Sequence, residues 1–411
     1  MRDGAVCAGV DWAKDTHEVL VADADGERLW AATITHDESG VSRLCQALVE
    51  LEVARVAIER PDGLLIERLL DAGLSVIAIH PNMVKAARDR FRPAGGKSDR
   101  FDAFVLCELA RTDSHRFRAL TPDSDQTKAL RALTRGREVL VEQRVALCNQ
   151  LRAELERFWP GATMIFADLD SPISLAFLQR YPSPIDARGL GAKRLAQFLA
   201  RHHYCGRRSA DALLTRLRDA PTGRASETEA DARRGLVLAL VAALKPIVEQ
   251  IQLLTSEIAH AVRAHPDGHI FLSFFRDPKS VICAATLLAE IGDDRGRYPT
   301  SEHLAADAGM TPVAVESGRK KVACFRRGCD HRLRAATATL ADATRHWHPW
   351  AQDRYAAARG RGHDHSRAIR TLGRGWTRVL WRCWQDGVAY DPQRHTTLQR
   401  HLEITNPNAG G

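Results

Sequence analysis

The sequence predicts an α/β domain at the N-terminus, then a long helical middle, then a small, mostly helical C-terminal domain. Three patterns indicate this order. Strand-like and helix-like stretches alternate as far as residue 112, apolar residues then recur at helical spacing along two long segments, and short strands interrupt the helices of the last third. Alternating strands and helices predict a central sheet that is covered by helices.

The N-terminal region begins with strand-forming residues over 5–35, which we read as two strands. The stretch AVCAGVDWA is apolar, and strand-like residues flank Asp25-Gly26 in HEVLVADADGERLWAATI, a strong hairpin signal. A helix over 40–50, the strand ARVAIE, the helix DGLLIERLLDAG and the buried strand LSVIAIH follow. A further helix spans 98–112, so the expected order is β-β-α-β-α-β before that last helix.

Two long amphipathic helices are predicted in the middle, over about 125–158 and 231–265. Their apolar residues repeat at three- and four-residue steps, as in a coiled coil. Pro246 lies inside the second segment and predicts a kink. The first apolar face contains Leu130, Leu133, Leu140, Leu147, Leu151, Leu155 and Phe158, and the second contains Leu240, Leu244, Ile247, Ile251, Leu254, Ile258 and Val262. The helices could pack on each other or mediate dimerisation, and the spacing allows both.

The last third carries a helix in SVICAATLLAEIG and a second helix, SEHLAADAG, which we expect Ser301 to cap. The stretch VAVESGRKKVACF predicts two short strands joined by a turn at Ser317 and Gly318. We therefore divide the chain into an α/β domain (1–122), a helical, coiled-coil-like region (123–268), a C-terminal domain (269–395) and a flexible tail (396–411).

Bulk composition is that of a soluble protein, with 45% hydrophobic and 27% charged residues among 411. No uninterrupted apolar run is long enough for a membrane span and no signal peptide is evident, so we expect a cytoplasmic, nucleoid-associated bacterial protein without a membrane partner. Nine cysteines without paired spacing indicate reduced thiols. Cys324, Cys329 and His331 lie close together, but without a C-x-x-C pair a zinc site is disfavoured.

A formal charge of +8, carried mostly by arginine, favours a polyanionic partner such as nucleic acid. Arginine suits phosphate because its planar fork binds two oxygens at once. An arginine-rich surface that merely reflects a GC-rich genome would give the same charge.

Four acidic residues in the N-terminal domain form the main candidate site. Asp11 ends the first strand, Glu59 ends a later strand, and Asp99 and Asp102 stand three apart near a helix start. Taken singly, each could be an ordinary turn, cap or helix-dipole residue. Together, four hard oxygen ligands suit Mg²⁺, with Mn²⁺ as an alternative, and two such ions can stabilise the attacking and leaving oxygens of a phosphoryl transfer.

The strings GVDWAKDTHEV, VAIERPDG and GKSDRFDA resemble the RuvC-like, ribonuclease-H-fold domain of the DEDD insertion-sequence transposases. In the last third, LLAEIGD, YPTSEHLAADAGMTPVAVESG and CFRRGCDHRLRAAT resemble the second conserved domain of that family. The resemblance implies an RNase H-like fold in the N-terminal domain, and that Asp11, Glu59, Asp99 and Asp102 are a catalytic, metal-binding tetrad. One stretch departs from it: FFRDPKSVICAA stands where the family usually carries a Gly-rich helix-hairpin-helix turn, so nucleic-acid contact by FFRDPKSV is left open.

The same resemblance implies that Ser317 is a nucleophile which forms a covalent phosphoserine link to DNA. A serine hydroxyl needs a base or metal to activate it. The turn after Ser317 is basic, and basic residues follow it as far as the C-terminal helix, where tryptophans on the other faces predict core packing. As nucleic-acid contacts we predict Arg319, Lys320, Lys321, Arg326, Arg327, Arg367, Arg370, Arg374 and Arg378. His363 and His365 fit a polar loop better than a metal site.

The leading hypothesis is a Mg²⁺-dependent, site-specific DNA transposase or recombinase of a mobile element. The alternative is a RuvC-like endonuclease or junction resolvase that activates water. An actin-type ATPase lacks the further Gly-rich loops it would need, and a catalytically dead nucleic-acid binder is a further possibility. The resemblance also implies element-end and target DNA, a structured non-coding guide RNA, and a dimer or tetramer. Target sequence, need for the RNA and oligomer number do not follow from the sequence.

Overall fold

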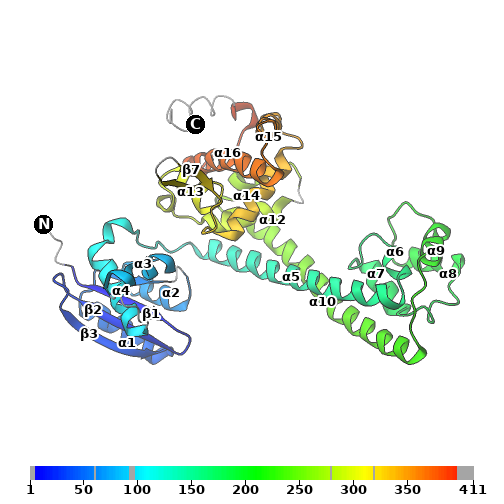
Figure 1. The fold of residues 1–411 in the computed structure, drawn as a ribbon, viewed down its shortest axis with the longest axis horizontal. Coiled ribbons are helices and arrows are strands. Elements are labelled where there is room, and N and C mark those ends of the chain that lie inside the picture. Colours follow the sequence, from blue (N-terminus) through cyan, green and yellow to red (C-terminus); the bar gives the residue numbers. More distant parts are fainter. Residues whose placement is uncertain (1–4, 60–61, 92–97, 278–279, 318–319, 396–411) are drawn as a thin grey trace. The chain divides into compact units, whose positions relative to one another are not determined.

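The computed structural model describes residues 5–59, 62–91, 98–277, 280–317 and 320–395. The chain forms two compact units, residues 1–124 and residues 125–411, which are described separately. Figure 1 labels most of their helices and strands.

The first unit is built on a five-stranded mixed sheet in the order β3-β2-β1-β4-β5. Its strands are β1 (Cys7–Trp12), β2 (Thr16–Ala22), β3 (Arg28–Thr35), β4 (Arg55–Ile58) and β5 (Val76–Ala78). The pairs β1–β2 and β2–β3 are antiparallel, whereas β4 runs parallel to β1 and to β5. Three strands, not the expected two, occupy residues 5–35. A tight turn, with a hydrogen bond from the Ala13 N–H to the Thr16 carbonyl, follows the first apolar stretch and separates β1 from β2.

Helices cover both faces of this sheet. They are α1 (Glu38–Glu50), α2 (Leu64–Asp71), α3 (Pro81–Phe91) and α4 (Asp99–Thr112), with the short η1 (Ser114–Arg116) after α4. Because successive strand residues point to opposite faces, Val10 packs with α1 and α2, whereas Cys7 and Ala57 pack with α3 and α4. The α/β class is confirmed, although α3 was not predicted.

The second unit is organised by two long helices, α5 (Asp125–Phe158) and α10 (Glu227–Ala264), which lie side by side (Figure 1). Both long helices are confirmed, while a coiled-coil geometry stays a prediction. The shorter helices α6 (Gly161–Met164), α7 (Pro172–Arg180), α8 (Ala192–Arg201) and α9 (Ala210–Arg218) surround a core that includes Phe177, Leu195 and Leu213.

One helix, α10, is long and apolar enough to cross a membrane, since an 18-residue window has a mean hydropathy of 1.7. A core helix of a soluble protein passes the same test of length and composition. Here 33% of that window is buried, and α10 packs along α5, which gives its apolar side chains a protein partner.

The C-terminal part of this unit is mostly helical. It contains α11 (Gly268–Leu272), α12 (Val281–Ile291), η3 (Arg295–Arg297), α13 (Ser301–Asp307), α14 (His331–Thr344), α15 (Pro349–Gly360), α16 (His365–Asp386) and η4 (Pro392–Arg394). The strands β6 (Val313–Ser317) and β7 (Lys320–Cys324) form an antiparallel hairpin. Ser301 is not the cap that we expected, because Thr300 holds the N-cap position and makes no side-chain capping bond.

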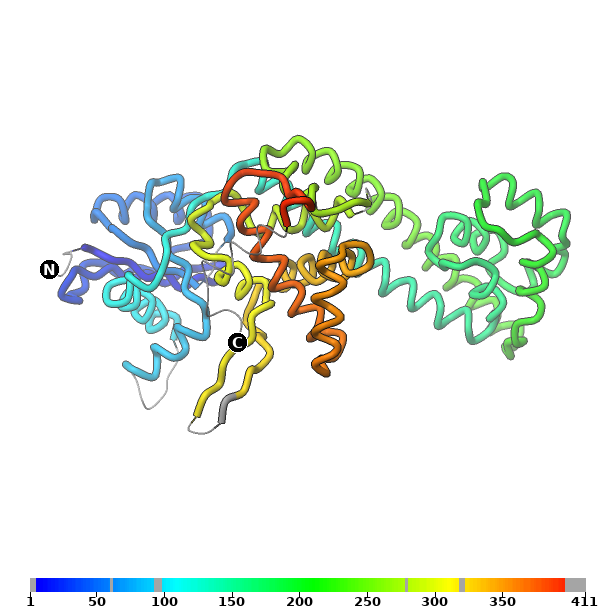
Figure 2. The backbone as a smooth tube through the Cα atoms, turned by 90° about the horizontal axis from the view of Figure 1, so that it is seen from above, coloured from blue at the N-terminus to red at the C-terminus, as the bar shows by residue number. Residues whose placement is uncertain are grey.

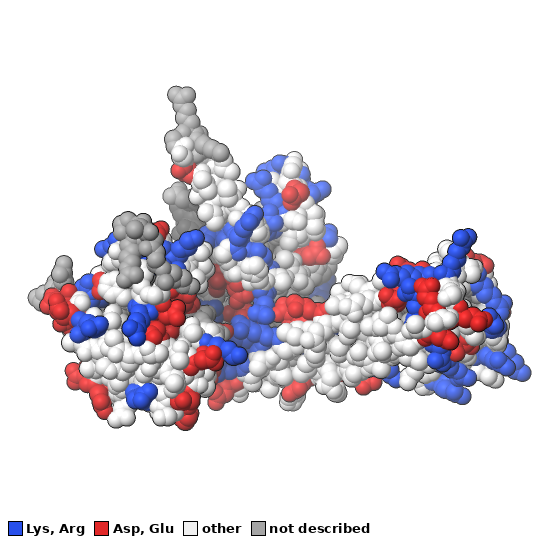
Figure 3. Space-filling model, turned by 60° about the horizontal axis from the view of Figure 1, so that its bottom comes forward, with Lys and Arg blue, Asp and Glu red and all other residues white. Residues whose placement is uncertain are grey.

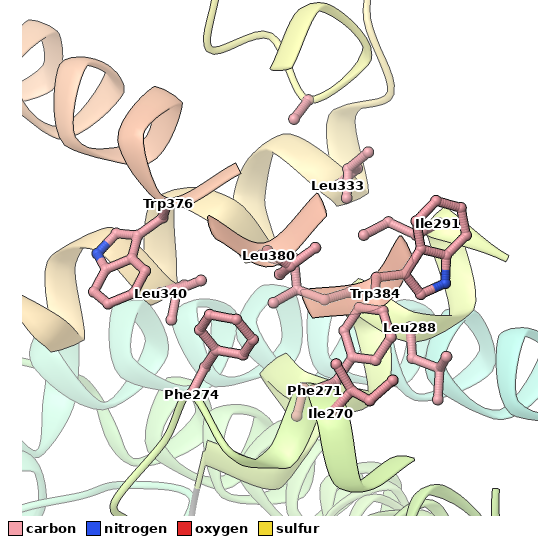
Figure 4. Packing of buried hydrophobic residues seen from close by; sticks show 14 of the residues in the cluster. Ile270, Phe271, Phe274, Leu288, Ile291, Leu333, Leu340, Trp376, Leu380 and Trp384 are labelled. Carbon is pink, nitrogen blue, oxygen red and sulfur yellow. The ribbon is translucent and has the colours of Figure 1, made fainter. Parts of the chain in front are cut away.

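Aromatic side chains fill the core beneath α16. Trp376 and Trp384 are completely buried and lie on two sides of Leu380, with Phe271 and Phe274 below them in Figure 4. The predicted core role of these two tryptophans is therefore confirmed. Residues from the long helices, including Leu130, belong to the same cluster. The proposed four-part division of the chain stays a prediction.

Candidate functional site

Asp11 and Glu59 lie on adjacent parallel strands at the same edge of the sheet. Asp11 is in β1, and Glu59 directly follows β4. The strand register pairs Val10 with Ile58. The residues that follow them, Asp11 and Glu59, are therefore neighbours at the ends of β1 and β4. Because side chains alternate along a strand, both acids belong to the face that α3 and α4 cover.

Helix α4 crosses this face with its N-terminus at the acidic edge. A Cβ on Gly9 would lie 2.1 Å from the Ala103 carbonyl oxygen, and the Cys107 thiol donates to the Cys7 carbonyl at 3.2 Å. Cys7 thus lies opposite Cys107, and Gly9, two residues further along β1, lies opposite Ala103, four residues earlier in α4. These steps match, since two strand residues span about 6.6 Å and four helical residues about 6 Å. One further step brings the Asp99 end of α4 beside Asp11.

The two acids of α4 differ in environment. Asp99 is the first residue of the helix and is exposed, next to the N-cap Ser98, whose hydroxyl accepts from the Phe101 N–H. Asp102 is buried, with 1% of its surface exposed. A buried carboxylate requires a compensating charge.

Arg88 of α3 supplies that charge. Its Nε and Nη2 donate to the two oxygens of Asp102 at 2.5 and 2.6 Å. The same Nη2 lies 3.6 Å from Glu59 Oε1. A guanidinium from a helix outside the predicted tetrad therefore lies between two of its four members.

Metal ligation by the tetrad fits the chemistry of these side chains. Glu59 Oε1 is buried and has no hydrogen-bond partner among the described residues. Such an oxygen, beside further carboxylates, suits a hard cation such as Mg²⁺. Within the described ranges no three His, Cys, Asp or Glu side chains are gathered closely enough to hold a metal as they stand, which agrees with Arg88 lying between Glu59 and Asp102. The catalytic role of the four acids stays a prediction.

Sequence reasoning missed Arg88 and one further acid, Glu18. Glu18 on β2 is the register partner of Asp11, accepts a 2.5 Å hydrogen bond from the Thr33 hydroxyl and lies 3.5 Å from Arg100. Strand pairing could have indicated Glu18. No spacing rule indicates Arg88, because its role depends on how α3 packs against α4.

Ser317 is the last residue of β6 and is exposed, in register with Lys320 of β7. Figure 2 shows the hairpin extending away from the helices of its unit. Gly318 and Arg319 lie outside the described residues, and so do the side chains of Lys320 and Lys321. Ser317 therefore stands at the outer end of a hairpin strand whose described residues are all exposed.

A basic cavity of about 990 Å³ lies beside the base of this hairpin. It is lined by β7, α15 and α16 together with the segments that lead into and out of the hairpin, residues 309–312 and 325–326. Its cationic lining consists of Arg326, Arg354, Arg361, Arg367, Arg370, Arg374 and Arg378. Figure 3 shows Lys and Arg side chains gathered next to the hairpin in the C-terminal part. Five of the nine predicted nucleic-acid contacts line this cavity.

Glu302 of α13 neutralises part of this charge. It accepts from Arg374 at 3.0 Å through one carboxylate oxygen and from Arg378 at 2.9 Å through the other. Burial alone would raise the pKa of Glu302, but the Arg378 hydrogen bond and the nearby Arg374 charge lower it below its usual range. The arginine face is thus not purely basic, contrary to the appearance of the sequence.

The other predicted contacts differ in setting. Arg326 donates to the Thr311 carbonyl at 3.1 Å, and its neighbour Arg327 is exposed. Arg370 lies over the exposed ring of Phe325, with its guanidinium 4.9 Å from the ring centre. An arginine stacked on an aromatic ring keeps its donors free to reach a phosphate.

Three minor candidates also have defined places. Burial raises the pKa of the Cys329 thiol, which disfavours the thiolate that zinc would need. His365 Nδ1 lies 2.9 Å from the Tyr355 hydroxyl. In FFRDPKSV, Phe274 is completely buried and Arg276 lies 4.2 Å from the Trp347 ring, while residues 278–279 lie outside the described ranges.

Comparison with known proteins finds transposase family matches in the N-terminal and the C-terminal parts of the chain. A DEDD transposase model of the IS110 type matches residues 8–160, and a model described as "Transposase IS116/IS110/IS902 family" matches residues 280–356. The mini-circle candidate transposase for IS117 from Streptomyces coelicolor is 33% identical over 402 residues, which cover 95% of this chain and 96% of the relative. The 42 kDa protein of insertion element IS900 from Mycobacterium paratuberculosis is 28% identical, covering 95% and 98%.

The relatives extend over nearly the whole chain, and the first family model spans all four acids of the α/β unit. Such DEDD domains suggest an RNase H-like fold, in keeping with the mixed sheet and its covering helices. The chain belongs to the IS116/IS110/IS902 family of transposases.

Proposed function

We propose that the protein is a Mg²⁺-dependent, site-specific DNA transposase or recombinase of a mobile element, and that Asp11, Glu59, Asp99 and Asp102 hold the metal. The observation that carries this proposal is the convergence of β1, β4 and the start of α4 at one edge of the sheet. Mg²⁺, or Mn²⁺ in its place, would supply charge neutralisation at a phosphodiester. The carboxylates would position that charge.

Ser317 is the proposed nucleophile. Its hydroxyl oxygen would lose its proton and bond to the phosphorus of one DNA strand while the bond from phosphorus to a deoxyribose oxygen breaks. The released deoxyribose oxygen takes up one proton, so that no net proton is gained or lost. The phosphoserine link retains a phosphodiester for rejoining. Exposure of Ser317 on a projecting hairpin supports this role, because a DNA backbone can reach it without unfolding the protein.

The basic cavity is the proposed site for the nucleic-acid backbone. Seven arginines line it, and single phosphate contacts add together in affinity. Cutting and exchanging several strands in concert further favours a dimer or tetramer. A structured non-coding RNA from the element, pairing with DNA, is the proposed guide to the target. Its phosphates carry the same charge as DNA and suit the same arginines.

A structure-specific endonuclease or junction resolvase is the second candidate. It would use the same acids but activate water, so it needs no serine. The carboxylate edge favours both candidates equally, whereas an exposed Ser317 favours the transposase.

The decisive experiment incubates the full chain with Mg²⁺, element-end DNA and co-transcribed RNA, then looks for a protein–DNA adduct that survives denaturation. We expect the adduct to map to the peptide containing Ser-Gly-Arg-Lys at 317–320. Ser317→Ala should lose the adduct, and Asp11→Asn should lose both the adduct and cleavage.

The matched control is Ser301→Ala, a serine elsewhere in the same unit. Cleavage that persists in Ser317→Ala would support the resolvase and reject the serine nucleophile. Unchanged cleavage in Asp11→Asn would reject the metal site. Omitting the RNA tests guidance separately: cleavage of element ends without any RNA would contradict it.

A further inference from the structure

Arg88 is the feature of the acidic site that the proposed chemistry does not use. It belongs to α3, and its side chain is only 21% exposed. Its planar fork engages both oxygens of Asp102, at 2.5 and 2.6 Å. Bidentate pairs of this kind are among the stronger charge-assisted hydrogen bonds.

The environment of Asp102 explains why a cation is needed there. The Asp102 side chain is 2% exposed and the Glu59 side chain 26%, and Nη2 of Arg88 approaches both carboxylates. Two ionised carboxylates without a cation between them would repel each other in a medium that screens charge poorly. In the absence of metal, Arg88 provides the positive charge that keeps both groups in place.

Arg88 occupies the space beside the Asp102 and Glu59 oxygens that a metal ion would need. Both Asp102 oxygens accept from Arg88. Among the described residues Glu59 Oε1 has no hydrogen-bond partner, and it stands 3.6 Å from Arg88 Nη2. Each carboxylate oxygen keeps a second lone pair, but a cation that binds Asp102 and Glu59 together has to enter the space beside the Arg88 guanidinium, whose positive charge opposes it unless the arginine moves away.

We infer that Arg88 is a positioning residue which stands in for the cation, holds Asp102 and Glu59 in the metal-free protein, and is displaced when a divalent metal binds. This inference rests on the proposed metal-binding role of the tetrad. Arg88 is then a built-in competitor: the carboxylates set the affinity of the site for metal, and the neighbouring positive charge of Arg88 lowers it.

Direct binding of Mn²⁺ to the metal-free full chain tests this role, by titration calorimetry together with thermal unfolding. Arg88→Ala should bind Mn²⁺ roughly tenfold more tightly, a change of about 1.4 kcal/mol. Its melting temperature without metal should fall, and the rise on adding Mn²⁺ should exceed that of the wild type. Arg88→Lys retains a charge without the fork and should give a smaller gain in affinity.

Arg90→Ala is the matched control. Arg90 lies on the same helix and its side chain is 65% exposed, with Asp113 at 3.9 Å as its acidic neighbour. Removing it should leave Mn²⁺ affinity unchanged. A gain as large as that of Arg88→Ala would mean that the general charge of α3, and not the Arg88 contact, sets affinity, and would overturn the inference.

The remaining outcomes separate this inference from the proposed function. Mn²⁺ binding that Asp102→Asn abolishes but Arg88→Ala leaves unchanged would overturn the Arg88 role alone. A purely structural arginine would lower the melting temperature equally with and without Mn²⁺. Absence of Mn²⁺ binding in both wild type and Arg88→Ala would overturn the metal site itself. If Arg88→Ala does not fold without metal, the affinity of Arg88→Lys decides, and a value equal to the wild type rejects the inference.

Discussion

The carboxylate edge of the α/β unit and the arginine cavity of the helical unit are opposite in charge but similar in construction. In the first, one arginine, Arg88, lies between Asp102 and Glu59. In the second, one glutamate, Glu302, lies between Arg374 and Arg378. Each cluster of like charge thus contains a counter-ion that contacts two of its members.

The difference between the two lies in burial. Asp102 is almost completely buried, whereas the side chains of Arg374 and Glu302 are 36% and 32% exposed. Ion pairs near solvent contribute little to stability, and buried ones cost much when one partner is removed. We therefore expect substitutions at the carboxylate edge to have larger effects than those in the cavity.

The largest effect is expected for Asp102→Asn. The substitution removes one charge from the metal site and leaves Arg88 without its strongest partner. Metal-dependent cleavage of element-end DNA should fall about a thousandfold, the equivalent of roughly 4 kcal/mol of transition-state stabilisation. The measurement is the initial cleavage rate at saturating Mg²⁺.

Asp89→Asn, which changes an exposed acid of α3, is the control and should cleave normally. Circular dichroism separates lost chemistry from lost folding. A folded Asp102→Asn protein with normal cleavage activity would show that Asp102 has a structural role only and is not needed at the metal site.

Acidification should reduce the stability of both units in the same pH range. Burial, reinforced by the neighbouring His36 charge, lowers the pKa of His17 to about 4, and burial next to His348 lowers that of His395 to about 4. Unfolded histidine titrates near about 6.5, so the unfolded chain takes up protons first as pH falls. The stabilising contribution is complete above about 6.5 and is lost as pH falls through about 4.

The expected loss is about 1–3 kcal/mol for each histidine, measured by urea unfolding between pH 7 and pH 4. His17→Asn should flatten the dependence for the α/β unit, while His115→Asn, at an exposed position, should not. If stability rose on acidification, the assignment of these histidines as neutral in the folded protein would be wrong.

In the cavity, Arg370→Ala should weaken DNA binding about fivefold and reduce the slope of log affinity against log salt by about 1. Arg370 lines the cavity and stacks on Phe325. The control is Arg382→Ala, on the same helix, because Arg382 pairs with Asp386 and does not line the cavity. Fluorescence anisotropy over a range of salt concentrations measures both quantities. Equal losses in the two variants would show that net charge, and not the cavity, binds DNA.

The smallest effect is expected for Glu302→Gln, which should tighten DNA binding about threefold at low salt, since it frees charge on Arg374 and Arg378. Asp386→Asn frees Arg382 outside the cavity and should leave affinity unchanged. Weaker binding by Glu302→Gln would reverse the comparison, because it would mean that Glu302 orients the arginines instead of competing for them.

Periodicity in the sequence predicted much of the fold. The long helices α5 and α10 begin and end within four residues of the predicted positions, and the hairpin around Ser317 has the expected strands. It failed where a local signal was weak: three strands occupy residues 5–35, where two were expected, and α3 was missed. Residue types and their order also indicated the four acids as a candidate cation site, and the resemblance to the DEDD transposases implies that they form a tetrad; that role stays a prediction.

The sequence by itself determined which elements form and which charges the protein carries, since hydrophobic spacing and residue type act over a few neighbouring positions. Only the tertiary structure decided which opposite charges meet. Arg88 reaches Asp102 across two helices, and Glu302 reaches Arg374 from 72 residues away. Such pairs depend on the packing of whole elements, and an ion pair leaves no spacing pattern in the chain because its energy depends on distance in space.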